Sequence, residues 1–503
     1  MSAAIRLNLH FNHVHWTAKP GKPEGRFLAD LSNAKSGQVL NNDSAKSAIE
    51  ARYGRCYLPT IRDIVTTIYD VANTCGGLSF VSLWKDDIVS AFNQWNFSPT
   101  SACLLAFRLS VDVCLIQYTG NFGWQGSPSV WGVFNRAFDR AVSSVIRGKV
   151  SIYVDDVIAA SPTVCAVLDQ AAAQDVIRGA LGHDAINNDK STTPCRCLDA
   201  IGWTIDLENE RVYPNEKGCS KLAAVFFSVD LSQPLSHNLL QRMGSLAARY
   251  SQAVIGTRPF VNAFFEALKH PGSHHATPQI RLAILVWRAV AITLLTAPLS
   301  LAVPLSFFLS IRITPELVGT TDAGPEGIGV VIRDTTGRLV AFCSYRLPFV
   351  ALESKYQNVR EFLGLLLGCF LAAQFSSQTS LRITWINDNT SALSWARKDI
   401  SRSSAAQAAF LAWTWCCVQA KVVLVDAQWI PGLSMGDVDS LSRFRPVVAL
   451  DPAFDVSHKL PLELLDSLFR LTDPTVNPEH PRPWDSIVPI IISLVHRCLT
   501  QWL

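Results

Sequence analysis

The spacing of apolar residues predicts two mixed segments separated by a helical one. Short apolar runs alternate with helical stretches through the first two hundred residues, which is typical of an α/β or α+β domain. Between about residues 215 and 290 the apolar residues recur at helical spacing, with helices expected near residues 239–247, 260–268 and 280–290. This stretch is therefore predicted to be mostly helical.

A second α/β pattern begins at Leu317. We expect a turn at residues 334–337, where Asp, Thr and Gly cluster, and a proline-containing tail of weak pattern after Phe444. No internal repeat is found. The strands are predicted at residues 318–321, 329–333, 339–345, 381–386 and 421–428, and a helix at residues 358–374.

Residues 289–311 contain no charge over a length that could span a bilayer. Pro298 and Pro304 interrupt this stretch, and a strand-like segment follows it. We favour a buried helix followed by an apolar linker, and a membrane span is the alternative. The first residues lack the charged start and apolar run of a cleavable signal peptide.

Composition fits a large multi-domain protein. The 503 residues suggest three or four domains at about 150 residues each. Hydrophobic residues make up 49% and charged residues 17%, against about 25% charged in typical soluble domains, so large cores or partner-covered surfaces are expected. The net charge of +3 permits a nucleic-acid groove without indicating one. The 13 cysteines lack metal-ligand spacing, and we interpret them as reduced intracellular thiols.

The strongest local signal is residues 151–159 (SIYVDDVIA), in which two apolar runs flank Asp155 and Asp156. This pattern predicts a tight hairpin with both acids at its tip. Adjacent buried carboxylates resist joint ionisation, and Mg²⁺, which prefers oxygen ligands, removes that cost. Taken alone, such a pair is more often an exposed acidic turn. A strand ending at Asp87 could add a third carboxylate for two-metal phosphoryl transfer, with Asp86 as the rival ligand.

The order of these motifs resembles the reverse transcriptases of long-terminal-repeat and tyrosine-recombinase-type retrotransposons. Residues 16–20 (WTAKP) and 26–32 (RFLADLS) are similar to the fingers hairpin, and residues 58–61 (LPTI) to the segment before the palm. The resemblance implies that Lys19 and Arg26 bind the incoming triphosphate. Residues 122–128 (FGWQGSP) resemble the template and nucleotide contact motif, which implies nucleotide binding at Gln125 and Gly126.

The same resemblance implies roles for the remaining palm residues. The spacing to residues 90–92 (SAF) selects Asp87 as the metal ligand, and Asp155 is the more direct ligand of the hairpin pair. Phe92 would exclude a ribose 2′ hydroxyl, although a lone aromatic is usually a core residue. Residues 188–191 (NDKS) and 201–203 (IGW) resemble the late palm motif and the primer grip, which implies that Lys190 donates a proton to pyrophosphate.

The domain after Leu317 carries a second set of motifs, which resemble those of retroelement ribonuclease H. They are residues 321–324 (TDAG), 360–361 (RE), 386–389 (INDN), 431–432 (PG) and 437–443 (DVDSLSR). The resemblance implies that four carboxylates hold two Mg²⁺ ions and hydrolyse the RNA of an RNA–DNA hybrid, selected through its 2′ hydroxyls. These carboxylates are Asp322, Glu361, Asp388 and Asp439.

Individually these acids are ordinary strand-end or cap residues, and their order carries the prediction. Asp322 and Asp388 should end strands, Glu361 should lie near a helix start, and Asp439 should open the last helix. Asp437 is the alternative to Asp439. The chain departs from the family where Trp429 replaces a frequent histidine and Met435 a frequent asparagine.

Together these patterns predict a multi-domain α+β and α/β protein, a right-hand polymerase followed by a ribonuclease-H-like domain. Fingers and palm would cover residues 1–215, helical thumb and connection 216–314, the ribonuclease-H-like domain 315–445, and a tail 446–503. Gln241, Arg242 and Arg249 are either nucleic-acid backbone contacts or a solvated helix face.

The expected activities are RNA-directed DNA polymerisation and hybrid ribonuclease cleavage, with two Mg²⁺ per site and Mn²⁺ as a substitute. The expected partners are an RNA template, a DNA primer, an RNA–DNA hybrid and deoxynucleoside triphosphates, inside the cell and without a membrane. Three alternatives remain: a nucleic-acid-binding protein without turnover, a membrane-associated protein, and an enzyme with one activity only.

Overall fold

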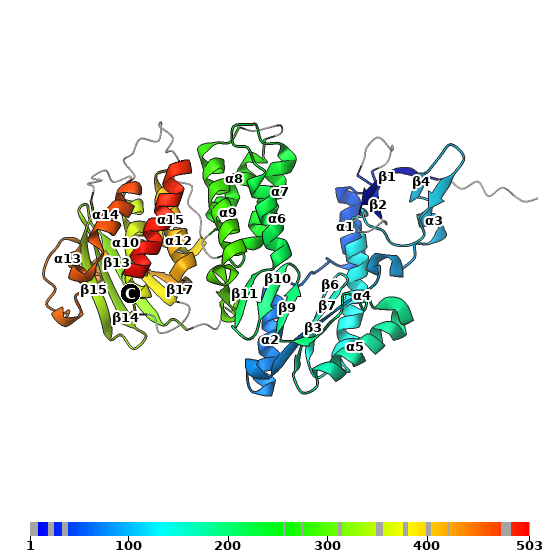
Figure 1. Cartoon of the computed structure of the whole chain (residues 1–503), viewed down its shortest axis with the longest axis horizontal. Coiled ribbons are helices and arrows are strands. Elements are labelled where there is room, and N and C mark those ends of the chain that lie inside the picture. The colour runs from blue at the N-terminus through cyan, green and yellow to red at the C-terminus, as the bar shows by residue number, and fades with distance from the viewer. Residues whose placement is uncertain are drawn as a thin grey trace, which may run out of the picture. The chain divides into compact units, whose positions relative to one another are not determined.

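The computed structural model describes residues 9–18, 25–32, 39–254, 257–270, 272, 275–309, 314–348, 356–375, 381–398, 404–420, 422–473 and 484–501. The chain forms two compact units (Figure 1). The N-terminal unit comprises Met1–Ile201 and Ile205–Asn209, and the C-terminal unit comprises Gly202–Thr204 and Glu210–Leu503. The C-terminal unit therefore contains both the helical segment and the second α/β pattern.

The N-terminal unit contains two four-stranded sheets, ordered β2-β1-β4-β5 and β6-β7-β3-β8. Its strands are β1 (Phe11–Ala18), β2 (Gly25–Asp30), β3 (Val81–Asp87), β4 (Ala106–Arg108), β5 (Cys114–Ile116), β6 (Lys149–Tyr153), β7 (Asp156–Pro162), β8 (Thr192–Cys195) and β9 (Cys197–Ala200). Its helices are α1 (Asp43–Tyr53), α2 (Ile61–Cys75), α3 (Pro99–Ala102), α4 (Ser127–Ser143) and α5 (Ala166–Leu181).

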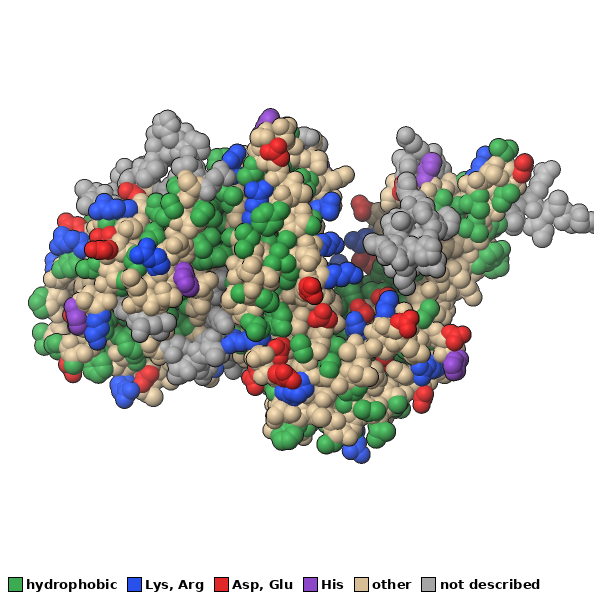
Figure 2. Space-filling model, viewed as in Figure 1, with side chains coloured by type: hydrophobic (Ala, Val, Ile, Leu, Met, Phe, Trp, Pro, Cys, Tyr) green, Lys and Arg blue, Asp and Glu red, His purple; other side chains and the backbone are tan. Residues whose placement is uncertain are grey.

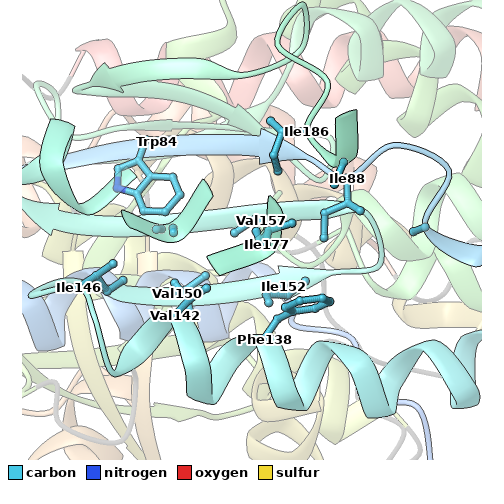
Figure 3. Packing of buried hydrophobic residues seen from close by; sticks show 14 of the residues in the cluster. Trp84, Ile88, Phe138, Val142, Ile146, Val150, Ile152, Val157, Ile177 and Ile186 are labelled. Carbon is cyan, nitrogen blue, oxygen red and sulfur yellow. The ribbon is translucent and has the colours of Figure 1, made fainter. Parts of the chain in front are cut away.

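The second of these sheets is built on a dense apolar core. β3 pairs antiparallel with β7, and β6 pairs antiparallel with β7. Side chains of the sheet and of α4 and α5 meet in one cluster, in which Trp84, Ile88 and Val157 are fully buried (Figure 3). Burial of such large apolar groups is the dominant favourable term in folding, so the sheet is a rigid support for residues at its strand ends.

The C-terminal unit contains a helical segment and one five-stranded sheet. β10 (Trp203–Asp206) lies at the boundary of the two units. The strands that follow are β11 (Arg211–Pro214), β12 (Val303–Pro304), β13 (Leu317–Ala323), β14 (Gly327–Asp334), β15 (Leu339–Arg346), β16 (Leu381–Asn387) and β17 (Val422–Trp429). The helices are α6 (Glu216–Phe227), α7 (His237–Tyr250), α8 (Pro259–Ala267), α9 (Pro278–Thr296), α10 (Gln357–Ala373), α11 (Thr390–Lys398), α12 (Gln407–Ala420), α13 (Gly436–Ser442), α14 (Leu462–Leu471) and α15 (Trp484–Gln501).

The five-stranded sheet has the order β15-β14-β13-β16-β17. Its first three strands form an antiparallel meander, and β13, β16 and β17 are parallel to one another. Helix α10 is buried at every residue from Val359 to Ala372. Contacts with β13, β14 and α12 explain why residues 362–373 of this helix are apolar on all sides.

The expected order of elements is confirmed over most of the chain. The three successive strands, the helix after them, and the turn at residues 334–337 are present, with Gly337 at φ +87° as such turns require. After residue 445 the sequence pattern predicted only a tail, and the structure differs. It contains α14 and α15, and buried Leu465 and Phe469 pack α14 against the rest of the unit, so α13 is not the last helix.

The uncharged stretch at residues 289–311 is not one helix. Helix α9 ends at Thr296, and short 3₁₀ turns and β12 follow. Pro298 begins the next turn, in agreement with its expected role as a helix breaker. By length and composition alone α9 could cross a membrane. Half of its apolar stretch is buried within the protein.

Candidate active sites

In the N-terminal unit, Asp87 and the Asp155-Asp156 pair lie at neighbouring strand ends. Asp87 is the last residue of β3 and pairs with Asp156, the first residue of β7. The backbone N–H of Ile88 donates to the carbonyl of Asp155 at 2.7 Å, which ties the end of β3 to the hairpin tip. The sheet register thus brings together three acids from two distant segments, as the pattern predicted for a hairpin and a strand.

The hairpin tip has an unusual backbone. Val154 has a φ of 55°, a left-handed conformation that is strained for a β-branched residue. The indole Nε1 of Trp131 in α4 donates to the carbonyl of Val154 at 2.6 Å. The buried Trp131 of α4 therefore holds a strained residue directly before Asp155. Such strain persists only where the surroundings over-determine it, and it clusters at functional sites.

Two ammonium groups neutralise these acids. Lys190 Nζ lies 2.6 Å from Asp87 Oδ1, and Lys85 Nζ lies 3.9 Å from Asp156 Oδ1. Burial raises the pKa of Asp156; the Lys85 ammonium lowers it, and the neighbouring carboxylates of Asp155 and Asp87 raise it further. Lys190, expected at the leaving pyrophosphate, is placed against a candidate metal ligand.

Asp86 occupies the opposite face of β3. Its side chain is fully buried, and its Oδ1 accepts hydrogen bonds from Gln170 and Gln174 of α5, both at 3.0 Å. Successive residues of a strand point to opposite faces, so Asp86 cannot join Asp155 while Asp87 does. The geometry favours Asp87 over its rival.

Asp87, Asp155 and Lys190 line a pocket of about 840 Å³. Phe92 lines the same pocket, and its ring centroid lies 5.1 Å from that of Phe122. Phe92 is 8% exposed, so it is at once a core residue and part of the pocket wall. A bulky ring at that place can restrict the shape of a ligand that approaches Asp87.

The other expected nucleotide contacts are not placed at this pocket. Lys19 lies outside the described residues, and the side chain of Arg26 is not described. Gln125 donates to the carbonyl of Asn42 at 2.8 Å, and Gly126 is required because a Cβ there would lie 2.4 Å from the Trp124 ring. Neither is among the residues that line the pocket.

In the C-terminal unit, carboxylates of Asp322, Glu361 and Asp388 converge. One oxygen of each lies within 4.8 Å of the others, so the group could hold a metal ion. Asp322 comes from the end of β13, Glu361 from the first turns of α10, and Asp388 directly follows β16. We call these three side chains the carboxylate trio. Among the described residues no other group of three metal-ligating side chains is as close.

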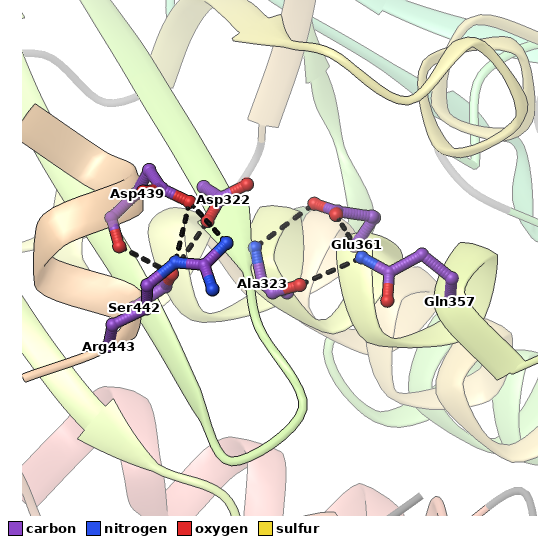
Figure 4. Close-up of polar contacts among 7 residues, drawn as sticks. All are labelled: Asp322, Ala323, Gln357, Glu361, Asp439, Ser442 and Arg443. Carbon is purple, nitrogen blue, oxygen red and sulfur yellow. Dashed lines mark hydrogen bonds and ion pairs between the residues drawn. The ribbon is translucent and has the colours of Figure 1, made fainter. Parts of the chain in front are cut away.

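Glu361 is the most perturbed member of the trio. It is 2% exposed, and burial, reinforced by the nearby Asp322 carboxylate, raises its pKa from 4.5 to about 8. Its Oε2 accepts from the backbone N–H of Ala323 at 3.2 Å, and its Oε1 accepts from Gln357 (Figure 4). Its Oε2 also accepts from Asn387 Nδ2 at 3.1 Å. Burial also raises the pKa of Asp322 and of Asp388.

Asn387 and Gln357 were missed as site residues from the sequence. Asn387 precedes Asp388 in the INDN motif, and strand alternation could have placed its side chain on the opposite, inner face. Ser442, in the DSLSR run, was likewise missed, and its Oγ donates to Asp322 Oδ2 at 2.6 Å (Figure 4).

Asp439 is near the trio but engaged by an arginine. It is the fourth residue of α13, and its Oδ1 lies 2.7 Å from Arg443 Nη2. Its charge still contributes to the raised pKa of both Asp322 and Asp388. The alternative, Asp437, pairs with Arg333 at 3.7 Å, and its carboxylate is not part of the carboxylate trio.

The donor set fits a hard divalent cation. All three ligands of the trio are carboxylate oxygens, the type that Mg²⁺ and Ca²⁺ prefer. Burial is the main cause that raises the pKa of each of these acids, and a bound cation would offset the cost of ionising them. The palm acids offer the same ligand type, but at that site two ammonium groups provide part of the compensating charge.

Candidate nucleic-acid contacts outside these sites lie on α7. Gln241, Arg242 and Arg249 are exposed there, opposite the buried face of the helix. Figure 2 shows Lys and Arg side chains along the edge of α6 and α7. The exposure fits both interpretations of these residues, as backbone contacts or as a solvated face.

Comparison with known proteins gives structural likenesses only. No protein-family model matches the sequence, and no curated protein matches it. A solved foamy viral protease-reverse transcriptase dRH in complex with double-stranded DNA is similar, with 12% identity and a TM-score of 0.43, over 84% of this chain and 66% of that one. Another foamy viral protease-reverse transcriptase, in complex with an RNA/DNA hybrid, gives 13% identity and a TM-score of 0.42, over 84% and 51%. The chain thus spans between half and two thirds of the length of these two proteins.

Proposed function

We propose that the chain is an RNA-directed DNA polymerase of a retroelement that also hydrolyses the RNA strand of RNA–DNA hybrids. The observation that carries the proposal is the convergence of Asp322, Glu361 and Asp388 from three separate elements. The hairpin acids beside Asp87, in a separate unit, support the polymerase half. The order of motifs in the sequence supports both halves.

In the proposed hybrid ribonuclease, the trio binds divalent cations. When bound, Mg²⁺ would activate water and stabilise the charge that develops on the leaving oxygen. Glu361 is held by Ala323, Asn387 and Gln357, so its carboxylate is fixed before any ligand arrives. Ser442 orients Asp322, and Asp439 with Arg443 borders the site.

In the proposed polymerase, Asp87 and Asp155 face the pocket that would receive the primer end and the triphosphate. Phe92, braced by Phe122, would select deoxynucleotides by occupying the space of a 2′ hydroxyl. Lys190 would be released from Asp87 as cations bind and would become available to the leaving pyrophosphate. We assign fingers and palm to residues 1–215, thumb and connection to 216–314, and the ribonuclease-H-like domain to 315–445.

A hybrid-specific ribonuclease should cut one substrate among three. With Mg²⁺ and matched duplexes carrying a labelled strand, we expect cleavage of the RNA strand of a hybrid and none of double-stranded RNA or DNA. Contacts to 2′ hydroxyls on one strand only would give this selectivity. Gel analysis of the labelled strands gives the answer, and equal cleavage of double-stranded RNA would contradict the proposed specificity.

Replacement of Lys190 tests the ion pair at the palm. Lys190→Gln should strengthen Mn²⁺ binding there about fivefold, since an ion pair worth about 1 kcal/mol no longer competes for Asp87. Primer extension should become slower at the same time. Electron paramagnetic resonance in an Asp388→Asn background would follow the palm metal alone.

Lys149→Gln is the matched control for this variant, because Lys149 pairs with Asp70 at 2.7 Å and does not line the pocket. Mn²⁺ affinity that is the same in both variants and the parent protein would refute a competing role for Lys190.

A second candidate function is a hybrid ribonuclease whose palm binds nucleic acid without extending a primer. The two ion pairs at the palm favour it, because they compensate acids that a polymerase needs for metal binding. Hybrid cleavage without primer extension by the same preparation would distinguish it.

A further inference from the structure

One exposed aromatic ring lies beside the carboxylate trio. Trp429 is the last residue of β17 and is 54% exposed, and among the described side chains it is the one exposed tryptophan. Its Nε1 donates to the backbone carbonyl of Asp388 at 2.8 Å. The ring is therefore tethered next to a candidate metal ligand while more than half of it faces solvent.

The sheet register supports this placement. Trp429 pairs with Asn387 across the parallel strands β16 and β17, and the Asn387 amide bonds to Glu361. The backbone N–H of Ile430 donates to the carbonyl of Asn387 at 3.4 Å, which continues the pairing past the tryptophan. The indole is thus anchored at the sheet end where Asp388 also emerges.

The loop after β17 carries a second exposed apolar side chain. Leu433 lies in the 3₁₀ turn η9 (Gly432–Ser434) and is fully exposed. A Cβ on Gly432 would lie 2.6 Å from Asp388 Oδ2, so the backbone between Trp429 and Leu433 packs directly on that carboxylate. A single exposed leucine needs no explanation, but here two large apolar groups flank a backbone segment that packs on Asp388.

The chemistry of this surface favours nucleic acid over an apolar partner. The indole N–H is already bonded to the backbone, so the ring offers only its π faces. Arg443, about half exposed, borders the same trio through Asp439. Aromatic faces combined with cations are the usual means of binding nucleotides without regard to base sequence.

We propose that Trp429 and Leu433 form an apolar clamp that holds one strand of the nucleic-acid substrate against the carboxylate trio. A base or sugar ring of that strand stacks on the indole, and Leu433 packs against the adjacent nucleotide. The inference rests on the proposed hybrid ribonuclease activity and adds to it the residues that grip the substrate.

The test compares Trp429→Ala with Trp429→Phe. The phenylalanine variant loses the N–H bond to Asp388 but keeps an aromatic face, so it separates tethering from stacking. Binding of a fluorescent RNA–DNA hybrid is measured by anisotropy in EDTA, and KM and kcat for RNA cleavage are measured in Mg²⁺. Val448→Ala is the matched control, because Val448 is as exposed as Leu433 and is not part of the loop at Asp388.

We expect Trp429→Ala to weaken hybrid binding about tenfold, the size of one lost stacking contact, and Trp429→Phe to stay within about twofold of the parent. KM should follow Kd while kcat changes little. Leu433→Ala should weaken hybrid binding about threefold. This second variant still tests the clamp if Trp429→Ala does not fold. Unchanged binding in Trp429→Ala, or equal losses in the alanine and phenylalanine variants, would overturn the clamp. A parent protein that binds the hybrid but leaves its RNA intact would instead contradict the proposed ribonuclease, and the comparison of Kd values would still decide the clamp.

Discussion

Asp388→Asn is expected to lower hybrid cleavage by about a thousandfold and to leave primer extension unchanged. The substitution removes one negative ligand from the trio, and metal stabilisation of a transition state is worth several kcal/mol, of which about 4 kcal/mol corresponds to that factor. Asparagine keeps the shape of the aspartate side chain, so we expect little loss of activity through misfolding. Single-turnover cleavage of a labelled hybrid in Mg²⁺ gives the rate.

Asp437→Asn is the matched control for this prediction. Asp437 is another acid of the same domain, on α13, but its carboxylate pairs with Arg333 and is not part of the carboxylate trio. Its substitution should leave the cleavage rate within about threefold of the parent, a change of under about 1 kcal/mol. Similar losses in both variants would mean that the trio is not the site of hydrolysis.

In EDTA, the stability of the C-terminal unit should fall as pH rises from about 4.5 to about 8. The pKa of Glu361 is raised from 4.5 to about 8 by burial and by the Asp322 carboxylate, so in this range the folded state binds more protons than the unfolded state. The free energy of unfolding then decreases with pH, by about 5 kcal/mol at most for a shift of this size. The raised pKa values of Asp322 and Asp388 act in the same direction.

Mg²⁺ should reverse this loss, because a bound cation favours the ionised carboxylates. Thermal unfolding at pH 5 and pH 8, with EDTA or with Mg²⁺, measures both effects. Glu361→Gln should flatten the pH dependence and weaken the response to Mg²⁺, whereas Glu463→Gln, at an exposed position of α14, should change neither. A melting temperature that rises with pH in EDTA would show that Glu361 is ionised without a cation.

Much of the framework could be predicted from the sequence because its signals are local. A strand ending at Asp87, a hairpin tip at Asp155, and strands that deliver Asp322 and Asp388 each follow from a short β-like run that ends at an acid. Both Asp86 and Asp87 are buried, and it is the hydrogen bonds of Asp86 to α5 that distinguish the two acids.

The remaining features depend on contacts between distant segments. The bond from Asn387 to Glu361, the Ser442 bond to Asp322, and the ion pair of Lys190 with Asp87 depend on tertiary packing. The bond from Gln357 to Glu361 is local, because the two residues lie four apart on α10. Helix α14 was missed because prolines and polar residues around it mask a short amphipathic pattern, whose apolar side is buried by Leu465, Leu468 and Phe469.

Extension of a labelled DNA primer on an RNA template in Mg²⁺ tests the proposed polymerase, with the parent protein compared with an Asp155→Asn, Asp156→Asn variant. We expect the parent protein to lengthen the primer and shorten the RNA, and the variant to shorten the RNA only. A soluble parent protein that binds the hybrid but never lengthens the primer would contradict the polymerase, and equal extension by the variant would contradict the assignment of its active site.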